Sequence, residues 1–460
     1  MTQIAPAIYA LGILGLFILN RERGGRTSIT LWLPVVWVSI AGSRMVSQWL
    51  EMTPSTSVDQ LSDGSPLDRN ILMGFLAVGL IILLARGQKI GALLRANGPI
   101  LVYFLYCGLS IFWSDYPGVA FKRWTKSVGD LVMILIVLTD PDTSAAVKRF
   151  LSRTAFILLP LSVLFIKYYP AFGRTYDRWV GTASYTGVTT DKNMLGMLCL
   201  VLGLASWWRL LQCFRDGKRA HRMRQLIAHV VVFATALWLL SIAHSMTSLA
   251  CFVLAGCLMA ATSLPLVVRR PALVHVLVFT VLLIAFSALF LNLGTGLVMA
   301  MGRDPTLTGR TDVWNTVLGM APNHLLGAGF ESFWLGPRLQ KLWSIYWWRP
   351  SEAHNGYIET FLNLGWTGVV LLAVVMVAGY RRIVYAVYRH EEAGTLALGY
   401  FVASVAYNFT EAAFKTMNLV WICLLLANIV VSKAHVTREA TLVQAAPELG
   451  PQVASMTNSA

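Results

Sequence analysis

Long apolar runs separated by short polar segments dominate the chain. A run such as Leu273–Leu293 is long enough for a membrane-spanning helix, which needs about 17–25 mainly apolar residues. The pattern predicts an all-α, polytopic membrane bundle of about 12–13 transmembrane helices. The expected spans are 4–20, 29–50, 71–85, 99–113, 128–139, 150–167, 193–212, 225–243, 247–266, 273–295, 356–379, 395–412 and 417–432.

Composition agrees with this pattern. Of the 460 residues 56% are hydrophobic and 13% are charged, whereas soluble chains carry roughly 25% charged residues. The first apolar run, Ile4–Asn20, precedes its arginines, the reverse of a signal peptide, and is expected to be a retained helix. The six cysteines lie in or beside apolar segments without metal-ligand spacing, so neither disulfides nor a metal site is expected.

The distribution of basic residues gives an orientation. The net charge is +15, and 22 of the 37 Lys and Arg fall in one set of alternate loops. Segment 209–224 alone holds six, which predicts a cytoplasmic loop, with the N-terminus outside and the C-terminus inside. The positive charge is therefore interpreted as membrane orientation and contact with membrane lipids, not as binding of nucleic acid.

Two extramembrane segments differ in character. Residues 1–435 are expected to form the membrane domain, and 436–460, polar and rich in small residues, a disordered cytoplasmic tail. The large outer loop, about 296–355, carries five tryptophans and five basic residues, which argue against disorder. Because long loops in compact proteins are usually functional or disordered, this loop is the first place to expect a site.

Several polar motifs have ordinary structural explanations. The Asp140–Pro141–Asp142 sequence resembles a metal–nucleotide-sugar motif but falls at a cytoplasmic helix end, where such residues mark a boundary. His244 can be interfacial or part of a site. Segment 110–130, with a proline turn and then basic residues, predicts a helix on the outer membrane surface or contact with anionic lipid.

Segment 172–196 is a candidate anion site. Arg174 and Arg178 lead into an expected helix that starts near Lys192. A helix N-terminus presents free N–H groups and partial positive charge, which suit a phosphate. The alternative is that Thr190 or Asp191 only caps the helix.

The return of the large loop to the membrane is the sharper candidate. His354, Asn355 and Glu359 lie at the outer end of an expected span, where ionisable residues are costly without a function. Spacing on a helix would bring His354 near the face of Glu359. The alternative is a helix start capped by Asn355.

At these residues the chain resembles the superfamily of O-antigen ligases and exopolysaccharide polymerases. The match covers roughly 100–430, and the DKN and GRTDVW forms are most similar to polymerases of the ExoQ type. The motifs that carry the resemblance are WSDYPGVAFKR (113–123), GVTTDKNMLG (187–196), GRTDVW (309–314), LLGAGFESFW (325–334) and AHNGYIETFLNLGWTG (353–368).

The resemblance implies a GT-C-like membrane glycosyltransferase without a cofactor. It would transfer oligosaccharide from an undecaprenyl-pyrophosphate carrier to an acceptor hydroxyl at the periplasmic face of a bacterial inner membrane. The implied catalytic residues are Arg310 and His354, with a further pyrophosphate-binding arginine that is Arg174 or Arg178. Lys192 is expected to bind the pyrophosphate too, and Arg123, Asn355 and Glu359 to serve the acceptor or support the site. The family usually has an even number of helices, which places one early span in question.

The chemistry supports this interpretation separately. Pyrophosphate is an activated leaving group, so the protein must supply positive charge, for which guanidinium groups are suited, and a proton acceptor such as histidine. No metal ligand set is expected on the outer face. A flippase and a chain-length regulator are the expected protein partners of such a polymerase. The alternative functions are an O-antigen ligase acting on lipid A-core, or a polysaccharide transporter or non-catalytic assembly subunit. A transporter would be expected to carry midplane charges and internal repeats, whereas these charges gather at the outer rim.

Overall fold

The structure is a computed structural model, and it describes residues 3–21, 27–51, 64–176, 181–215, 222–290 and 310–431. Three expectations therefore lie outside the described residues. These are the tail 436–460, the first part of the large loop, and Arg178.

Helices make up nearly all of the described secondary structure, and the one sheet is a short antiparallel hairpin of β1 and β2. The elements are α1 (Ala5–Leu19), η1 (Ile29–Leu31), α2 (Trp32–Ala41), α3 (Val46–Trp49), α5 (Pro66–Arg86), α6 (Gln88–Ala96), α7 (Gly98–Leu109), η2 (Ser110–Trp113), α8 (Pro117–Leu138), α9 (Thr143–Tyr168), α10 (Pro170–Gly173), β1 (Arg174–Tyr176), β2 (Ala183–Tyr185), α11 (Lys192–Arg215), α12 (Arg222–Ala243), α13 (Met246–Ala261), α14 (Pro265–Val268), α15 (Pro271–Phe290), α17 (Arg310–Gly319), α18 (Gly336–Ile345), α19 (Gly356–Tyr388) and α20 (Gly394–Tyr407). A last helix covers Leu419–Val431.

Every segment expected to span the membrane contains a helix. Among the described residues five helices, α5, α9, α11, α12 and α19, are individually long and apolar enough to cross a bilayer. The pair formed by α6 and α7, bent by 85°, is a sixth candidate, and six further apolar helices are shorter. The all-α, polytopic membrane class is confirmed.

Helix α8 differs from the expected arrangement. The sequence predicted a surface helix within 110–130 and then a short span at 128–139, but Pro117–Leu138 is one continuous helix. Its first half carries Lys122, Arg123 and Lys126, while all of its last ten residues are buried. Asp130 joins the two parts, since it accepts hydrogen bonds from Trp37 Nε1 (2.8 Å) and Met417 N (2.9 Å).

The exposed apolar residues identify the lipid-facing helices. Soluble proteins rarely expose large contiguous apolar patches. Here α1 exposes Ile8, Leu11 and Leu14, and α5 exposes Ile81 and Leu84. In contrast, 83% of the most apolar stretch of α11 is buried inside the bundle. The bundle therefore has a protein core around α11 and an apolar outer surface.

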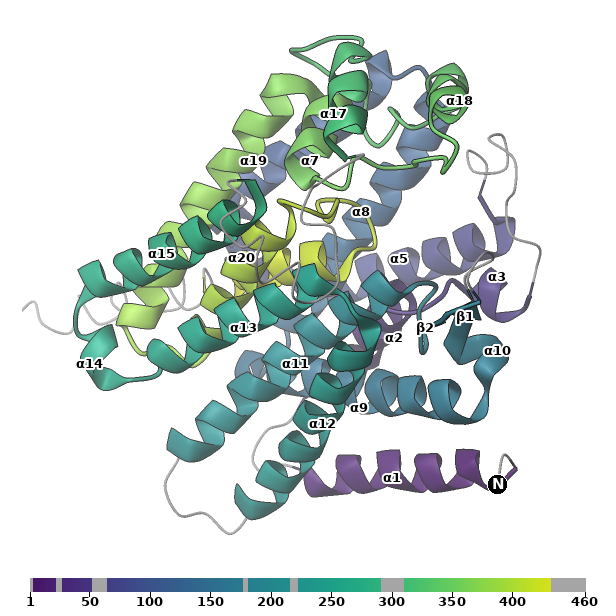
Figure 1. The fold of residues 1–460 in the computed structure, drawn as a ribbon. Coiled ribbons are helices and arrows are strands. Elements are labelled where there is room, and N and C mark those ends of the chain that lie inside the picture. Colours follow the sequence, from purple (N-terminus) through teal and green to yellow (C-terminus); the bar gives the residue numbers. More distant parts are fainter. Residues whose placement is uncertain are drawn as a thin grey trace, which may run out of the picture.

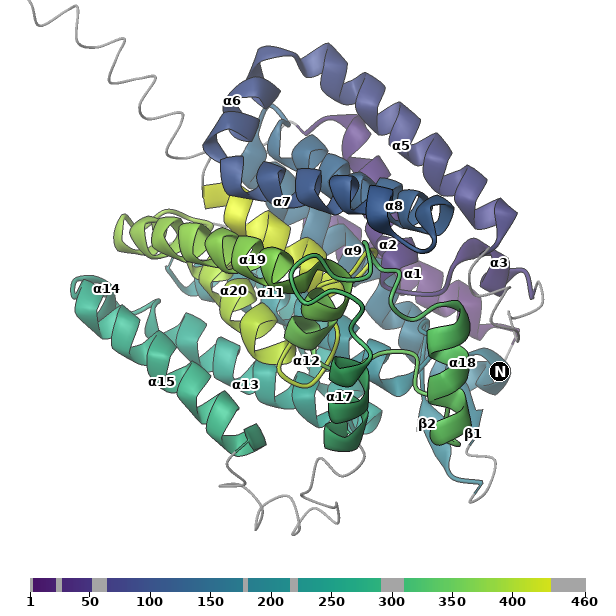
Figure 2. The ribbon, with the colours of Figure 1, turned by 90° about the horizontal axis from the view of Figure 1, so that it is seen from above.

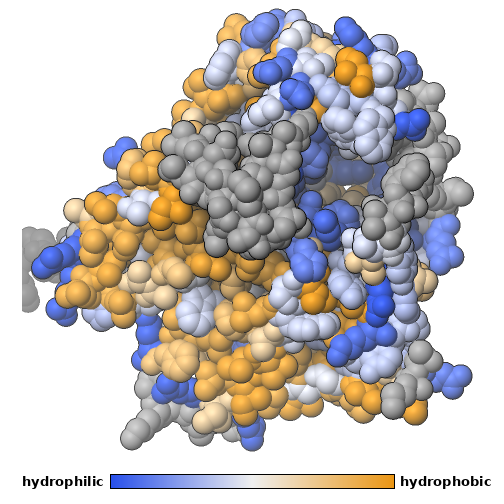
Figure 3. Space-filling model, in the orientation of Figure 1, coloured by the Kyte–Doolittle hydropathy of each residue, from blue (hydrophilic) through white to orange (hydrophobic). Residues whose placement is uncertain are grey.

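Helices α17 and α18 form a cap over one end of the bundle (Figures 1 and 2), at the opposite end from the lower ends of α11 and α12. A separate small core, which includes Val317, Phe333, Leu342 and Leu362, fixes the cap on α19. In Figure 3, hydrophilic residues gather round a hollow beneath this cap, whereas hydrophobic residues cover much of the lower bundle.

Two glycines allow the cap to approach α19 closely. Gly365 has a φ of +64°, and a Cβ there would lie 2.3 Å from the Leu325 backbone. Gly327 has a φ of +73°, and its Cβ would lie 2.4 Å from the backbone of Asn363. Because side chains at either position would clash and φ is positive, these glycines are required for the contact.

Candidate active site

Three segments that are distant in sequence meet beneath the cap. They are the start of α17 at Arg310, the loop 349–355 before α19, and the loop 408–418 between α20 and the last helix. The backbone N–H of Gly356 donates to Asn408 O (2.9 Å), which joins the second and third segments. The charged side chains of all three therefore face one another.

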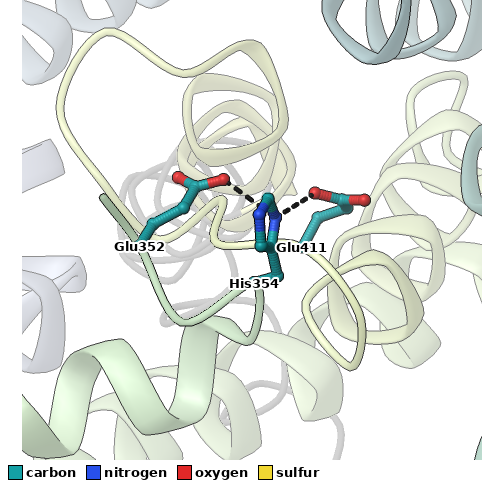
Figure 4. A group of neighbouring side chains, drawn as sticks. All are labelled: Glu352, His354 and Glu411. Carbon is teal, nitrogen blue, oxygen red and sulfur yellow. Dashed lines mark hydrogen bonds and ion pairs between the residues drawn. The ribbon is translucent and has the colours of Figure 1, made fainter. Parts of the chain in front are cut away.

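His354 lies between two carboxylates (Figure 4). Its Nδ1 is 3.1 Å from Glu352 Oε1 and 3.2 Å from Glu411 Oε2. The φ of His354 is +49°, an uncommon conformation for a residue with a side chain. Of the seven described non-glycine residues with positive φ, Glu331, Arg349 and His354 line the cavities described below, which is the clustering expected of a functional site.

The carboxylates determine the charge state of His354. Burial lowers its pKa, but the hydrogen bonds and charges of Glu352 and Glu411 outweigh burial and raise the pKa to about 9. Burial alone would raise the pKa of Glu352, but the charge of Lys415 and the hydrogen bond with His354 lower it to about 2. At neutral pH the ring is therefore mainly imidazolium, and it must lose a proton before it can accept one.

Arg310 and Lys415 complete a network of ion pairs. Arg310 Nη1 donates to Thr410 O (2.6 Å), and its Nη2 is 3.5 Å from Glu411 Oε1. Lys415 Nζ donates to Glu352 Oε2 (2.5 Å). Ligand atoms of Glu352, His354 and Glu411 lie within 4.8 Å of one another, close enough to hold a cation. Since each carboxylate is already paired with a cationic side chain, we describe the cluster as ion pairs and assign no metal to it.

Asn355 and Glu359 hold the loop that carries His354. Asn355 Oδ1 caps α19 by accepting from Tyr357 N (3.0 Å) and Ile358 N (3.1 Å), and its Nδ2 donates to Phe409 O (3.0 Å). Glu359 does not share a helical face with His354, because α19 begins only at Gly356. Instead Glu359 accepts from Ala353 N (2.5 Å) and Trp334 Nε1 (2.9 Å). Both residues are positioning residues.

A cleft of about 450 Å³ opens beside the cluster. Arg310, Arg349, Glu352 and His354 line it together with Val313 and Trp348. The guanidinium of Arg349 lies 5.4 Å from the centre of the Trp343 ring and, among the described residues, pairs with no carboxylate. The cleft therefore has an excess of positive charge.

The described residues of the expected anion site at α11 do not line this cleft. Arg174 Nε donates to Ile166 O (2.9 Å), and its guanidinium lies over the Tyr185 ring. Asp191 Oδ1 caps α11 by accepting from Asn193 N (2.8 Å) and Met194 N (3.0 Å), so these N–H groups are already bonded, as the capping alternative predicted.

Lys192 is the first residue of α11, and the start of α13 lies between this end of α11 and the ion-pair network of Arg310, His354 and Glu411. A Cβ at Gly196 would lie 2.5 Å from the side chain of Ser245, and Thr247 bonds Thr410 through their hydroxyls (2.9 Å). Lys192 is therefore at the same end of the bundle as Arg310.

Other sequence motifs are structural. Asp140 is buried, accepts from Ser28 N (3.1 Å) and lies 3.8 Å from Arg86 Nη2, while Asp142 caps α9 through Ala145 N (3.0 Å). The interpretation of Asp140–Pro141–Asp142 as a helix boundary is confirmed. Arg123 donates to the carbonyl oxygen of Glu331 and lines a second cavity beside the cluster.

Sequence reasoning missed Glu331, Arg349, Glu352, Glu411 and Lys415. Glu411 and Lys415 belong to NFTEAAFKTMN (408–418), most of which falls within the ends of two expected spans, 395–412 and 417–432. The available signal was a run of polar residues between two apolar helices at the outer face, the same signal that identified His354.

The fold and this site define a class: a multi-pass helical membrane protein with a charged cleft under a cap at one end of the bundle. Comparison with known proteins narrows the class. Residues 229–373 match the family model described as O-antigen ligase. Over 290 residues the chain is 26% identical to the exopolysaccharide production protein ExoQ of Rhizobium meliloti (strain 1021), which covers 61% of this chain.

The chain is thus similar to the superfamily of O-antigen ligases and exopolysaccharide polymerases, the resemblance that its motifs indicated. The alignment spans 64% of the length of the Rhizobium meliloti relative.

Proposed function

We propose that the protein is a polysaccharide polymerase that transfers oligosaccharide units from a polyprenyl pyrophosphate, such as undecaprenyl pyrophosphate, to a sugar hydroxyl. The observation that carries the proposal is the cleft lined by Arg310, Arg349 and His354, where positive charge is in excess. A pyrophosphate leaving group needs such charge, because negative charge develops on it as the glycosidic bond breaks. The similarity to a relative named for exopolysaccharide production supports polymerase over ligase.

The reaction needs no covalent intermediate. The acceptor oxygen forms a bond with C1 of the donor sugar, the bond from C1 to the pyrophosphate oxygen breaks, and the acceptor proton passes to a base. Arg310 is held by Thr410 O and Glu411 so that its remaining N–H groups can face the phosphates. His354 contributes as the imidazolium, a second fixed positive charge beside the leaving group.

The other expected residues have supporting roles in this proposal. Asn355 and Glu359 fix the loop of His354. Lys192, at the same end of the bundle, is an outer contact for the donor, and Arg174 holds the adjoining hairpin. Arg178 remains a proposed contact outside the described residues.

We also propose that the cap faces the periplasm across a bacterial inner membrane. The end of α11 and the start of α12, which flank the dense basic segment 209–224 in sequence, lie at the end of the bundle opposite the cap (Figure 1), and basic loops are retained in the cytoplasm. A flippase that supplies the lipid-linked donor and a chain-length regulator are the expected partners.

Purified protein in liposomes, supplied with a polyprenyl-pyrophosphate-linked oligosaccharide, tests the proposal. The wild type should form polymer and release lipid pyrophosphate. Arg349→Gln should raise the donor KM roughly 10–100-fold, the loss expected for charge-assisted hydrogen bonds. The control Lys341→Gln removes the same charge from an exposed position of the cap outside the cleft and should change the donor KM less than about twofold. Transport of the donor without any glycosyl transfer would overturn the proposal.

A further inference from the structure

A second cavity adjoins the cleft and shares one wall with it. Its volume is about 180 Å³. Ser351 and Glu352 line both spaces, whereas Arg310, Arg349 and His354 line only the cleft, and Arg123, Glu331 and Trp334 only the second cavity. Glu352 is therefore the charged side chain at the junction.

The second cavity differs from the cleft in its charge. Three carboxylates, Glu331, Glu352 and Glu359, face two cations, Arg123 and Lys415. The cations do not exceed the carboxylates, so this space does not suit a pyrophosphate. It offers hydrogen-bond acceptors and donors side by side, which is what a neutral compound with several hydroxyl groups requires.

Four aromatic residues also line this cavity. Tyr103, Phe330, Trp334 and Phe414 line the cavity, and Trp334 is fixed by its hydrogen bond to Glu359 Oε2 (2.9 Å). A sugar ring presents apolar C–H groups on its faces and hydroxyls at its rim, so aromatic walls with a few polar groups match both. Since sites for drug-sized ligands measure about 300–1,000 Å³, a cavity of about 180 Å³ fits one sugar ring.

Glu331 is held in place by an uncommon backbone conformation. Its φ is +48°, its Oε1 accepts from Thr416 N (2.7 Å), and its carbonyl oxygen accepts from Arg123. Such strain persists only where the surrounding structure imposes it, and it clusters at binding sites. Contacts from two separate segments thus hold Glu331 at the cavity, one on its carboxylate and one on its backbone.

We propose that the second cavity binds the terminal sugar of the acceptor as a neutral monosaccharide unit, and that Glu352 orients its attacking hydroxyl by accepting a hydrogen bond from it. The inference rests on the proposed function. The hydroxyl oxygen bonds to C1 of the donor in the cleft, the C1–oxygen bond to pyrophosphate breaks, and the hydroxyl proton passes to water. Lys415, bonded to Glu352 Oε2, positions the carboxylate between the two substrates.

Variants in the second cavity separate acceptor binding from donor binding. Glu331→Gln keeps the shape of the side chain and should raise the acceptor KM roughly 10–100-fold, leaving the donor KM within about twofold. Arg123→Lys, which loses the guanidinium fork, should act in the same direction and serves if Glu331→Gln does not fold. The control Asp115→Asn removes a carboxylate whose partner is Arg338, outside both cavities, and should change neither KM.

Glu352→Gln tests the orientation of the attacking hydroxyl. It should lower kcat roughly 10–100-fold while the acceptor KM changes much less. If the wild type transfers sugar but neither Glu331→Gln nor Arg123→Lys changes the acceptor KM, this inference is overturned. The proposed function would then remain intact. Near-normal kcat in Glu352→Gln would remove the role of Glu352. Wild-type protein that transfers no sugar would instead overturn the proposed function itself.

Discussion

The charge of His354 can be tested by the dependence of activity on pH. Two carboxylates on Nδ1 raise its pKa from an ordinary value near 6.5 to about 9, although burial opposes the shift. At pH 7, two pH units below that pKa, only about 1% of the rings are neutral. If the neutral ring were the proton acceptor, the rate should rise about tenfold for each pH unit from 7 towards 9.

We expect the opposite profile. The imidazolium supplies charge beside the pyrophosphate, so the rate of transfer should be nearly constant up to about pH 9 and should fall above it. Glu411→Gln removes one of the two carboxylates that stabilise the imidazolium, and should move this break to lower pH. His354→Gln should be much slower and should lack the break. Initial rates of the purified proteins from about pH 6 to pH 10 measure all three profiles, and Lys341→Gln is the control.

One result would refute this reasoning. A wild-type rate that rises about tenfold per pH unit through pH 9, with no such rise in His354→Gln, would make the neutral ring the base, as the sequence analysis expected.

Three further predictions follow from the same contacts. Arg310→Lys keeps the charge but cannot reach Thr410 O and Glu411 together while facing a phosphate, so its activity should fall nearly as far as that of Arg310→Ala; near-normal polymer at equal protein level would contradict this. A phosphatase fusion at residue 320 should be active and one at residue 217 inactive, and the reverse would overturn the orientation. EDTA should leave the rate of the purified protein within about twofold, because Arg310 and Lys415 already pair with the carboxylates; a loss restored by magnesium or manganese would contradict this.

Much of the fold could be predicted from local sequence because the bilayer constrains it strongly. Apolar runs of sufficient length locate the spans, and each expected span contains a helix. The length of apolar runs did not predict α8 as one helix, because the basic residues in its first half interrupt the apolar run. Burial of Asp130 against Trp37 and Met417 could not be anticipated, because both partners are distant in sequence.

In the candidate site too, residues within recognisable motifs could be predicted, whereas contacts between distant segments could not. His354 and Arg310 could be identified from motifs, and the cap of Asn355 from its residue type. Glu411 and Lys415 could not be connected to them, because only folding brings residues 408–418 against 349–355. The spacing argument for Glu359 failed because His354 precedes α19 and adopts a positive φ, so helical periodicity does not reach it.

Glu411 links the two residues that the motifs identified. One oxygen pairs with Arg310 and the other with His354, so the carboxylate fixes both cations while it compensates only one of their charges. Glu352 likewise pairs with His354 through one oxygen and with Lys415 through the other. The result is a row of alternating charges from Arg310 to Lys415 that runs from the cleft to the second cavity. Such a row keeps cations rigid beside a leaving group without bound counter-ions, and it places a carboxylate where a second substrate can reach it.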